Sequence, residues 1–469
     1  MSIKLGVVIL AAGEGTRMKI DGPKTLAPLL GRGLIEYPLF ALEKFSKTFS
    51  GQIHISIVTG FQKQKVEQYL GDLKYSFNIN FVHQKERLGT ANAIESYLKQ
   101  CKNASDHDYT LILCADTPLL EASIFEKLFD SIEKNSLDAL CASFQLANPE
   151  GYGRIIRNKS QEHGFGIVEQ KDGSSEELLI KEVNSGVYLM KTSYLIEGIK
   201  GIDNKNASGE FYLTDLFSFD QKVQALEFSD PEIFLGVNNL VDLQKASKVL
   251  RRKKLDQFMK QGVLIHDPET TYLDDSVVIN PGVEIYPGVH LYGNTIIESG
   301  VVIESGSIIK NSHVHESTHI LAYCHLEKAE VFESCLIGPY ARLRPGAVIG
   351  KNSKIGNFVE IKSSRLEQGV KVSHLSYLGD AQVGEFSNIG CGFVTCNYDG
   401  KNKHKTVIGK NCFIGSDTQM IAPIELGDNC YVASGSTVNK SMPTGSFGIA
   451  RSRQETKLNM ASRFLKKSE

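Results

Sequence analysis

The stretch VVINPGVEIYPGVHLYGNTIIESGVVIESGSIIK, residues 277 to 310, repeats one feature every six residues. The aliphatic residues at this spacing are Ile279, Ile285, Leu291, Ile297, Ile303 and Ile309. A helix repeats about every 3.6 residues, and no array of helices or hairpins predicts a period of six. A parallel β-helix does, because every sixth residue points inward from successive faces of a triangular coil. Three hexapeptides then complete one coil, and the coils stack on each other.

The six-residue period continues downstream to the last part of the chain. Its further members are Ile337, Leu343, Ile349, Ile355 and Ile361, then Leu366, Val372 and Leu378, and finally Ile408, Ile414, Met420, Leu426, Val432 and Val438. The register slips between Ile361 and Leu366, and the polar stretch Asp399 to Thr406 predicts a loop that leaves the coil. Loops of this kind commonly carry function in solenoid proteins.

Upstream of residue 240, short apolar runs alternate with helical patterns. The runs are Leu5 to Ala12, Ile53 to Thr59, Thr110 to Cys114, Leu140 to Phe144 and Ile233 to Val237, with helical patterns at Thr90 to Lys99 and Ser123 to Glu133. This alternation predicts a doubly wound, mostly parallel α/β sheet that binds ligands at the carboxyl ends of its strands.

A helical spacing from Leu240 to Lys260 joins the two parts of the chain. The sequence therefore predicts a sheet domain over 1–239, a linking helix over 240–263 and a β-helix domain with a C-terminal tail over 264–469. The basic run Arg251-Arg252-Lys253-Lys254 in the helix is typical of a solvated helix face, with an anion-binding patch as the alternative.

The composition argues against nucleic-acid and membrane partners and indicates a reducing compartment. The 469 residues carry a formal net charge of −2, which does not favour nucleic acid as a partner. No stretch approaches the about 20 apolar residues of a membrane span, so we expect no membrane partner. Nine scattered cysteines without a CxxC pair indicate a reducing setting, and we expect a cytoplasmic protein.

The loop LAAGEGTRM, residues 10 to 18, follows the first apolar run as a phosphate-binding turn follows a strand. It is not a dinucleotide fingerprint, because Met18 stands where the third glycine belongs. It is not a P-loop either, because no Gly-Lys-Ser/Thr follows. Compact glycines still let backbone N–H groups approach phosphates, and Arg17 and Lys24 can neutralise phosphate charge.

Eleven ordered motifs carry a resemblance over essentially the whole chain. They are LAAGEGTRM (10–18) with Pro23-Lys24, RLGTANA (87–93), GYGRI (151–155), VEQKD (168–172), VNSGVY (183–188), GEFYLTD (209–215), GVNN (236–239), GPYARLRPG (338–346), GNFVEIK (356–362), SHLSYLGD (373–380) and CNYDG (396–400). The chain resembles the bacterial bifunctional N-acetylglucosamine-1-phosphate uridylyltransferase/glucosamine-1-phosphate acetyltransferases. The resemblance implies a Rossmann-like nucleotidyltransferase domain and a left-handed parallel β-helix of hexapeptide repeats.

The resemblance implies two activities. The β-helix domain would acetylate glucosamine 1-phosphate from acetyl-coenzyme A, and the sheet domain would couple the resulting N-acetylglucosamine 1-phosphate to UTP. Arg17 and Lys24 would be catalytic there, and Asp116 and Asn238 would hold Mg²⁺, whose preference is for oxygen ligands. The positions implied to bind UTP and the sugar nucleotide are Leu10, Ala11, Ala12, Gly13, Lys24, Gln84, Gly89, Thr90, Cys114, Ala115, Asp116, Gly153, Glu169, Asn184 and Asn238. Among them, the resemblance makes Gln84, Gly89 and Thr90 the uracil-reading positions, and Gly153, Glu169 and Asn184 the contacts to the N-acetylglucosamine moiety.

In the second domain the resemblance makes His374 the base that takes the proton of the attacking amine, a task that suits a near-neutral pKa. Glu360 is a candidate orienter of this base. The implied glucosamine-1-phosphate positions are Arg344, Lys362, Tyr377 and Asn388. The implied acetyl-coenzyme A positions are Cys391, Asn397, Tyr398, Ser416, Ser434 and Arg451.

The chain departs from the family pattern at Asn92, at Cys114-Ala115, and at Cys391 and Ser434, where alanine is usual. The family implies a homotrimer, because coenzyme A lies between neighbouring β-helices. Two other interpretations remain open. A nucleotidylyltransferase for another base or sugar would keep Arg17, Lys24 and Asp116, and a non-catalytic regulatory protein could reuse the same two folds.

Overall fold

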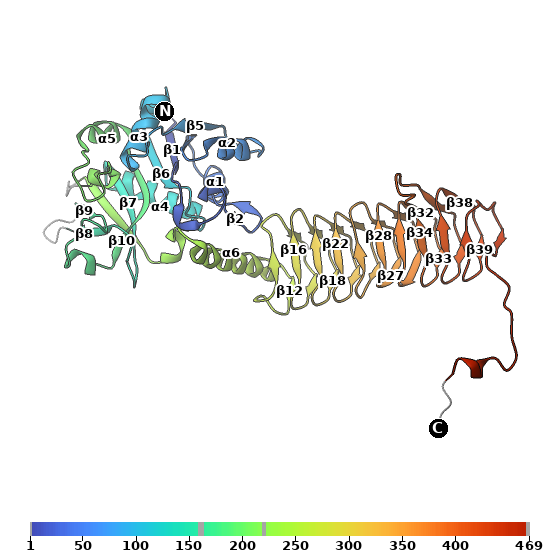
Figure 1. Ribbon diagram of the computed structural model, residues 1–469. Coiled ribbons are helices and arrows are strands. Elements are labelled where there is room, and N and C mark those ends of the chain that lie inside the picture. The colour runs from blue at the N-terminus through green and yellow to red at the C-terminus, as the bar shows by residue number, and fades with distance from the viewer. Residues whose placement is uncertain (1, 158–163, 218–221, 466–469) are drawn as a thin grey trace. The chain divides into compact units, whose positions relative to one another are not determined.

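The computed structural model describes residues 2–157, 164–217 and 222–465. The chain divides into two compact units, Met1–Leu250 and Arg251–Glu469. Figure 1 shows an α/β sheet in the first and a stack of short parallel strands in the second. Among the described helices, none combines the length and apolar character that crossing a membrane requires.

The first unit is built on a twisted sheet with the strand order β11-β7-β10-β6-β1-β4-β5. Strand β1 pairs in parallel with both β4 and β6, whereas β10 runs antiparallel to β6 and β7. The bounds are β1 (Lys4–Ala11), β4 (Gln52–Thr59), β5 (Ile79–His83), β6 (Tyr109–Cys114), β7 (Ala139–Gln145), β8 (Arg154–Arg157), β9 (Phe165–Val168), β10 (Glu182–Lys191) and β11 (Val223–Phe228), with the hairpin β2 (Pro28–Leu29) and β3 (Arg32–Gly33).

Helices cover both faces of this sheet, as a doubly wound fold requires. They are α1 (Glu36–Phe45), α2 (Lys63–Gly71), α3 (Thr90–Gln100), α4 (Ala122–Lys134) and α5 (Thr192–Gly198). The last helix, α6 (Leu240–Lys260), does not cover the sheet, and its Ala246 packs in a separate small cluster with Met18 and Ala27. Leu5, Val7 and Ile9 of β1 pack with α1 and α4, whereas Val8 packs with α3 on the opposite face. Successive side chains of a strand point to opposite faces of the sheet, so they pack into two separate hydrophobic cores.

One predicted strand is wrong. The apolar run Ile233–Val237 is not a strand, because Pro231–Phe234 forms a 3-10 helix (η7) and the chain after it has no regular structure. Phe234 and Val237 are nevertheless buried. The Val237 N–H donates to the Asp116 carbonyl at 2.8 Å, so this segment runs beside the end of β6 instead of joining the sheet.

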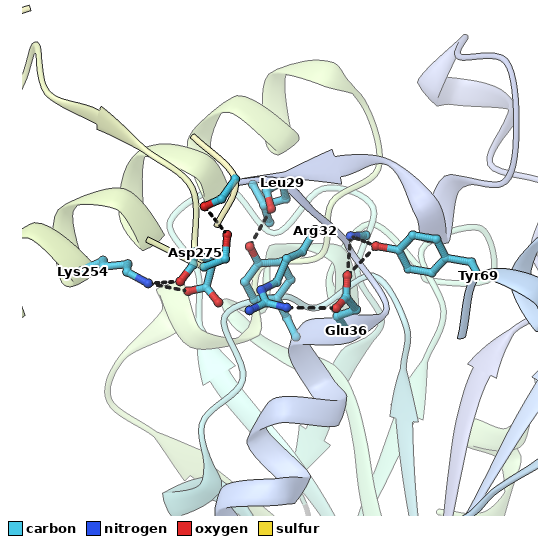
Figure 2. A network of polar contacts seen from close by, with 10 residues as sticks. Leu29, Arg32, Glu36, Tyr69, Lys254 and Asp275 are labelled. Atoms are coloured by element: carbon cyan, nitrogen blue, oxygen red, sulfur yellow. Dashed lines mark hydrogen bonds and ion pairs between the residues drawn. The ribbon is translucent and has the colours of Figure 1, made fainter. Parts of the chain in front are cut away.

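The β2–β3 hairpin is held to the start of α1 by a buried carboxylate (Figure 2). Glu36 is 2% exposed and accepts from the Tyr69 hydroxyl at 2.5 Å and from the Gly33 N–H at 2.9 Å, while Arg32 approaches its other oxygen at 3.3 Å. Burial, reinforced by the Glu36 carboxylate, raises the pKa of Tyr69 to about 12. The hairpin that follows Lys24 is therefore firmly positioned.

The second unit has three parallel sheets in which each strand pairs with the strand three positions later in the chain, except that β39 pairs with β41. Sheet I contains β12 (Leu264–Ile265), β15 (Glu284–Ile285), β18 (Val302–Ile303), β21 (His319–Ile320), β24 (Leu336–Ile337), β27 (Lys354–Asn357), β30 (Lys371–His374), β33 (Asn388–Ile389), β36 (Phe413–Ile414), β39 (Tyr431–Val432) and β41 (Phe447–Gly448).

Sheet II contains β13 (Tyr272–Leu273), β16 (His290–Tyr292), β19 (Ile308–Lys310), β22 (His325–Glu327), β25 (Arg342–Leu343), β28 (Glu360–Lys362), β31 (Tyr377–Gly379), β34 (Val394–Cys396), β37 (Gln419–Ile421) and β40 (Thr437–Val438). Sheet III contains β14 (Val278–Ile279), β17 (Ile296–Ile297), β20 (His313–Val314), β23 (Glu330–Val331), β26 (Val348–Ile349), β29 (Arg365–Leu366), β32 (Ala381–Val383), β35 (Thr406–Ile408) and β38 (Ile424–Leu426).

The residues of the six-residue period form one continuous core inside this coil, as predicted. The predicted slip from Ile361 to Leu366 belongs to a recurring pattern. Five-residue steps also separate Ile309 from Val314, Leu326 from Val331, and Leu378 from Val383, and all four lie at the corner between sheets II and III. This corner therefore accommodates changes in chain length that the other two corners do not show in these coils.

The predicted loop leaves the coil at the same corner, between β34 and β35. Thr406 is not part of it, because this residue begins β35 and is buried. The loop is organised by Asp399, which accepts from the Lys401 N–H at 2.8 Å, the Asn402 N–H at 2.6 Å and His404 at 2.7 Å. These bonds lower the pKa of Asp399, the backbone bond from Asn402 most of all.

The basic run in α6 mostly matches the predicted solvated face. Arg252 and Lys253 are exposed. Lys254 instead contacts Asp275 within the second unit (Figure 2), and the Arg251 guanidinium lies 4.2 Å from the centre of the Tyr272 ring. The cations of this run are therefore largely hydrated or engaged by groups of the protein itself.

Candidate active sites

The loop after β1 contains two glycines with different surroundings. Gly15 has a φ of +65°, and a Cβ added there would lie 2.4 Å from the Lys24 Cβ. At Gly13 an added Cβ would meet no protein atom within 4 Å. The fold therefore requires glycine at position 15, where the chain carrying Lys24 approaches closely, and leaves open space beside position 13.

Four predicted residues meet at the point where the sheet's strand order reverses. Lys24 Nζ contacts the Asp116 carboxylate and donates to Asn238 Oδ1 at 3.1 Å. The Arg17 guanidinium donates to the same Asn238 oxygen at 2.8 Å. Asp116 follows the end of β6 and Asn238 follows η7, so three distant segments build one polar cluster at the carboxyl ends of β1 and β6.

This cluster opens into a cavity of about 300 Å³. Its walls are Leu10, Ala11, Gly13, Gly15, Thr16, Arg17, Lys24, Thr25, Ala115, Asp116 and Asn238. Asp116 and Asn238 offer one carboxylate and one amide oxygen, and both already contact the same ammonium group. Two hard oxygen donors converging on one cation are a donor set that fits Mg²⁺.

A second cavity shares Leu10 and Gly13 with the first and contains the predicted base-reading residues. Leu10, Ala12, Gly13, Gln84, Gly89 and Thr90 line it. The Gln84 amide nitrogen donates to the Gly89 carbonyl at 3.1 Å and to Asn92 Oδ1 at 2.9 Å. Asn92, a departure from the family pattern, thus helps to fix the carboxamide of Gln84.

A third cavity of about 690 Å³ brings together the positions predicted to contact the sugar. Cys114, Asp116, Gly153, Glu169, Asn184 and Asn238 are among its lining residues. The Asn184 N–H donates to the Gly153 carbonyl at 2.9 Å, and the Thr214 hydroxyl donates to Glu169 at 3.0 Å. Burial raises the pKa of Glu169 above its usual range and raises that of the Cys114 thiol to about 12.

Sequence reasoning missed Arg154, which positions this third cavity. Arg154 is 2% exposed and donates to the Tyr152 carbonyl and to the Gln170 side chain at 2.9 Å. Gln170 also accepts from the Gly151 N–H at 3.1 Å. Arg154 therefore ties the segment around Gly153 to the segment around Glu169. The sequence places this arginine inside the motif GYGRI but does not show that it is buried, so its role becomes visible only in the structure.

On the β-helix, His374 ends β30 of sheet I, one coil beyond Asn357 of β27. Its Nδ1 lies 2.7 Å from Asn357 Oδ1. Glu360 is not the orienting group that we expected, because its carboxylate accepts from Arg344 at 2.7 Å. The register Asn357–His374 was hidden from sequence reasoning, because the seventeen-residue coil that pairs them depends on a shortened corner.

The predicted phosphate-binding cations lie along sheet II and its corner with sheet III. Arg344 follows β25 and Lys362 ends the neighbouring β28. Lys403 of the loop lies beside Lys362 and is the main cause of a lowered Lys362 pKa, since a second ammonium disfavours the charged form. Lys403 was not predicted. Tyr377 begins β31 on the same sheet, whereas Asn388 begins β33 on sheet I.

The positions predicted for acetyl-coenzyme A form a column and a loop. Cys391, Ser416 and Ser434 each stand two residues after a strand of sheet I, on three successive coils. Arg451 follows β41 on the next coil and donates to the Ser434 carbonyl at 3.0 Å. Asn397 and Tyr398 open the loop instead, where the Asn397 amide donates to Asp380 and Tyr398 is 61% exposed.

Comparisons with known proteins identify both parts of the chain. A family model described as a MobA-like NTP transferase domain matches residues 7–163, and one of bacterial transferase hexapeptide repeats matches residues 328–363 and 405–440. These matches confirm the predicted fold class, and the second is consistent with a left-handed β-helix.

Three relatives each carry the name bifunctional protein GlmU. The one from Pelobacter propionicus is 38% identical, with 99% of this chain and 99% of its own length aligned. The one from Trichlorobacter lovleyi is 41% identical, with 96% of both chains aligned. The one from Streptococcus mutans is 39% identical, with 97% of both chains aligned.

Proposed function

Because the chain belongs to the family of bifunctional GlmU proteins, we propose that it catalyses two consecutive reactions. Acetyl transfer from acetyl-coenzyme A to glucosamine 1-phosphate gives N-acetylglucosamine 1-phosphate. Uridylyl transfer from UTP to this product gives UDP-N-acetylglucosamine and pyrophosphate. The observation that carries the proposal is the convergence of Arg17, Lys24, Asp116 and Asn238 on one cavity at the sheet's switch point.

In uridylyl transfer, a phosphate oxygen of the sugar attacks the α-phosphorus of UTP as pyrophosphate leaves. Such a transfer needs charge neutralisation and in-line positioning more than covalent help. Arg17 and Lys24 supply positive charge at the triphosphate, while Gln84 faces the base cavity and Glu169 and Asn184 face the sugar cavity. Asp116 and Asn238 would hold Mg²⁺, which when bound adds charge neutralisation to the phosphates.

In acetyl transfer, the sugar amine attacks the thioester carbonyl and His374 takes the proton that the amine loses. The carbon–sulfur bond then breaks, and coenzyme A leaves as a thiolate that takes up this proton. The amide oxygen of Asn357 accepts only, so it favours the tautomer with hydrogen on Nδ1. The lone pair of Nε2 then remains available as the base. Arg344, Lys362 and Lys403 supply positive charge for the sugar phosphate, and Cys391, Ser416, Ser434 and Arg451 contact the acetyl donor.

We further propose a homotrimer located in the cytoplasm. Tyr323, Tyr340 and Phe358 form an exposed aromatic ladder on successive coils, with ring centres 5.3 Å apart at each step. Exposed Leu375 stands one coil further on, next to His374. An apolar patch of this kind is typical of a subunit contact. All nine cysteines are free thiols, which suits a reducing compartment.

We assign each reaction to one domain of the chain. Uridylyl transfer belongs to the domain 1–239 and acetyl transfer to the domain 264–469, and residues 240–263 link the two. Light scattering during gel filtration tests the trimer, because a fully active monomer at assay concentration would contradict it.

The experiment that tests the function is mass spectrometry of the products. Pure protein is mixed with glucosamine 1-phosphate, acetyl-coenzyme A, UTP and Mg²⁺, and UDP-N-acetylglucosamine is expected. Parallel reactions with ATP, GTP, CTP and dTTP separate this function from a nucleotidylyltransferase for another base. No product from any mixture would support a regulatory protein that only reuses the two folds.

A further inference from the structure

A cluster of metal-ligand side chains lies on sheet III, outside both candidate active sites. Glu298 follows β17, and His313 and His315 lie on or beside β20 of the next coil. His313 Nε2 is 2.6 Å and His315 Nδ1 is 3.3 Å from the same oxygen, Oε1 of Glu298. The three candidate ligand atoms all lie within 4.8 Å of one another.

The cluster is preorganised by its neighbours. The His315 ring stacks with the His313 ring, with centres 3.9 Å apart, and with the Phe332 ring, with centres 4.8 Å apart. Glu330 Oε1 lies 3.4 Å from His315 Nε2. A hydrogen on Nε2 that points to Glu330 leaves the lone pair on Nδ1, which faces Glu298. Carboxylates commonly orient metal-binding histidines in this way.

We propose that Glu298, His313 and His315 bind a divalent transition-metal ion of the zinc class. Two imidazole nitrogens and one carboxylate oxygen are a ligand set that zinc uses in proteins, with the fourth position left to water. The side chains are 24%, 33% and 20% exposed in that order, so an ion can enter from solvent. Imidazole nitrogens disfavour Mg²⁺ and Ca²⁺, which require oxygen ligands.

The bound ion would join two adjacent coils of the β-helix. Glu298 comes from one coil and both histidines from the next, while the orienting Glu330 comes from the coil after that. Because an ion that binds only the folded state stabilises it, zinc should raise the melting temperature of the protein.

The test uses the full chain. Metal is first removed with a chelator, and the protein is then dialysed against Zn²⁺ together with excess Mg²⁺. The Mg²⁺ keeps zinc from the predicted magnesium site at Asp116 and Asn238. Bound zinc is counted by inductively coupled plasma mass spectrometry. We expect one zinc per chain more in the unaltered protein than in His315→Ala. His319→Ala is the matched control, because His319 also pairs with a glutamate, Glu304 at 3.0 Å, but has no second histidine in the pair. It should keep the full zinc content.

Two further variants keep the proposal testable if His315→Ala fails to fold. Glu298→Gln preserves the side-chain size and should lose the same zinc ion. Glu330→Gln should weaken zinc binding by about 10- to 100-fold, as loss of an orienting group does. The melting temperature should rise with Zn²⁺ in the unaltered protein and in His319→Ala, should rise only at higher Zn²⁺ in Glu330→Gln, and should not rise in His315→Ala or Glu298→Gln. Equal zinc content in the unaltered protein and in folded Glu298→Gln would overturn the proposal.

Discussion

Gly13 and Gly15 belong to one loop, yet the structure gives them different reasons to be glycine. Gly15→Ala would force a non-glycine residue to φ +65° and place its Cβ against Lys24. This should lower the free energy of unfolding by about 1–3 kcal/mol and displace Lys24. Gly13→Ala meets no protein atom. It should leave stability unchanged and raise the KM for UTP, because its methyl group would occupy space that the phosphates need.

Thermal melting and steady-state kinetics with UTP separate the two glycine variants. A Gly13→Ala protein that melts as early as Gly15→Ala would show that the loop is packed more tightly than the structure indicates. Unaltered UTP kinetics in Gly13→Ala would instead argue against phosphate binding beside this residue.

Lys362 offers a second prediction for a single residue. Its pKa is lowered first by the Lys403 side chain, so removing that charge in Lys403→Met should raise the Lys362 pKa toward its ordinary value. Binding of glucosamine 1-phosphate should still weaken, because the anion loses one of two adjacent cations. A pH titration of the lysine side chains by NMR and a binding titration measure the two effects. A Lys362 pKa that stays constant or falls would contradict the pairing.

Among the elements, the β-helix could be predicted from the sequence because most inward positions repeat at six residues, although four steps between sheets II and III are five residues long. The helices α3, α4 and α6 were predicted to within a residue or two for a similar reason, since their apolar positions recur on one face. The run Ile233–Val237 failed because a short apolar segment can be buried without joining a sheet.

The candidate sites were predictable only where a motif carried them. Asp116 and Asn238 stand 122 positions apart in the printed chain and meet only through the sheet. The contacts of His374 with Asn357 and of Lys362 with Lys403 depend on where corners are short and where the loop leaves the coil. Sequence reasoning also missed His313 and His315, although two histidines two residues apart in a strand share one face.

The packing of one strand, β19, tests the six-residue period directly. Ile309 is fully buried, whereas its neighbour Ile308 is 37% exposed. Ile309→Ala should therefore lower the free energy of unfolding of the β-helix by about 2–5 kcal/mol. Ile308→Ala, the same change on the opposite face, should cost less than about 1 kcal/mol. Denaturant unfolding followed by circular dichroism compares them, and equal losses would mean that the two residues share one environment.

For the whole molecule, the account assigns each reaction to its own unit. Lys24 and its partners Asp116 and Asn238 lie in Met1–Leu250, and His374 with Asn357 lies in Arg251–Glu469. None of the residues proposed for one reaction is used in the other. Damage at one site should therefore leave the chemistry of the other intact.

The most direct measurement is to assay both half-reactions separately in Lys24→Ala and His374→Ala, each shown to be folded and of unaltered oligomeric state. His374→Ala should lose most acetyl transfer, because it removes the proposed base, and should retain uridylyl transfer to supplied N-acetylglucosamine 1-phosphate. Lys24→Ala should lose uridylyl transfer by several orders of magnitude and retain acetyl transfer, because it removes a charge that stabilises the phosphates. Loss of both activities in either variant would contradict the assignment of one reaction to each unit.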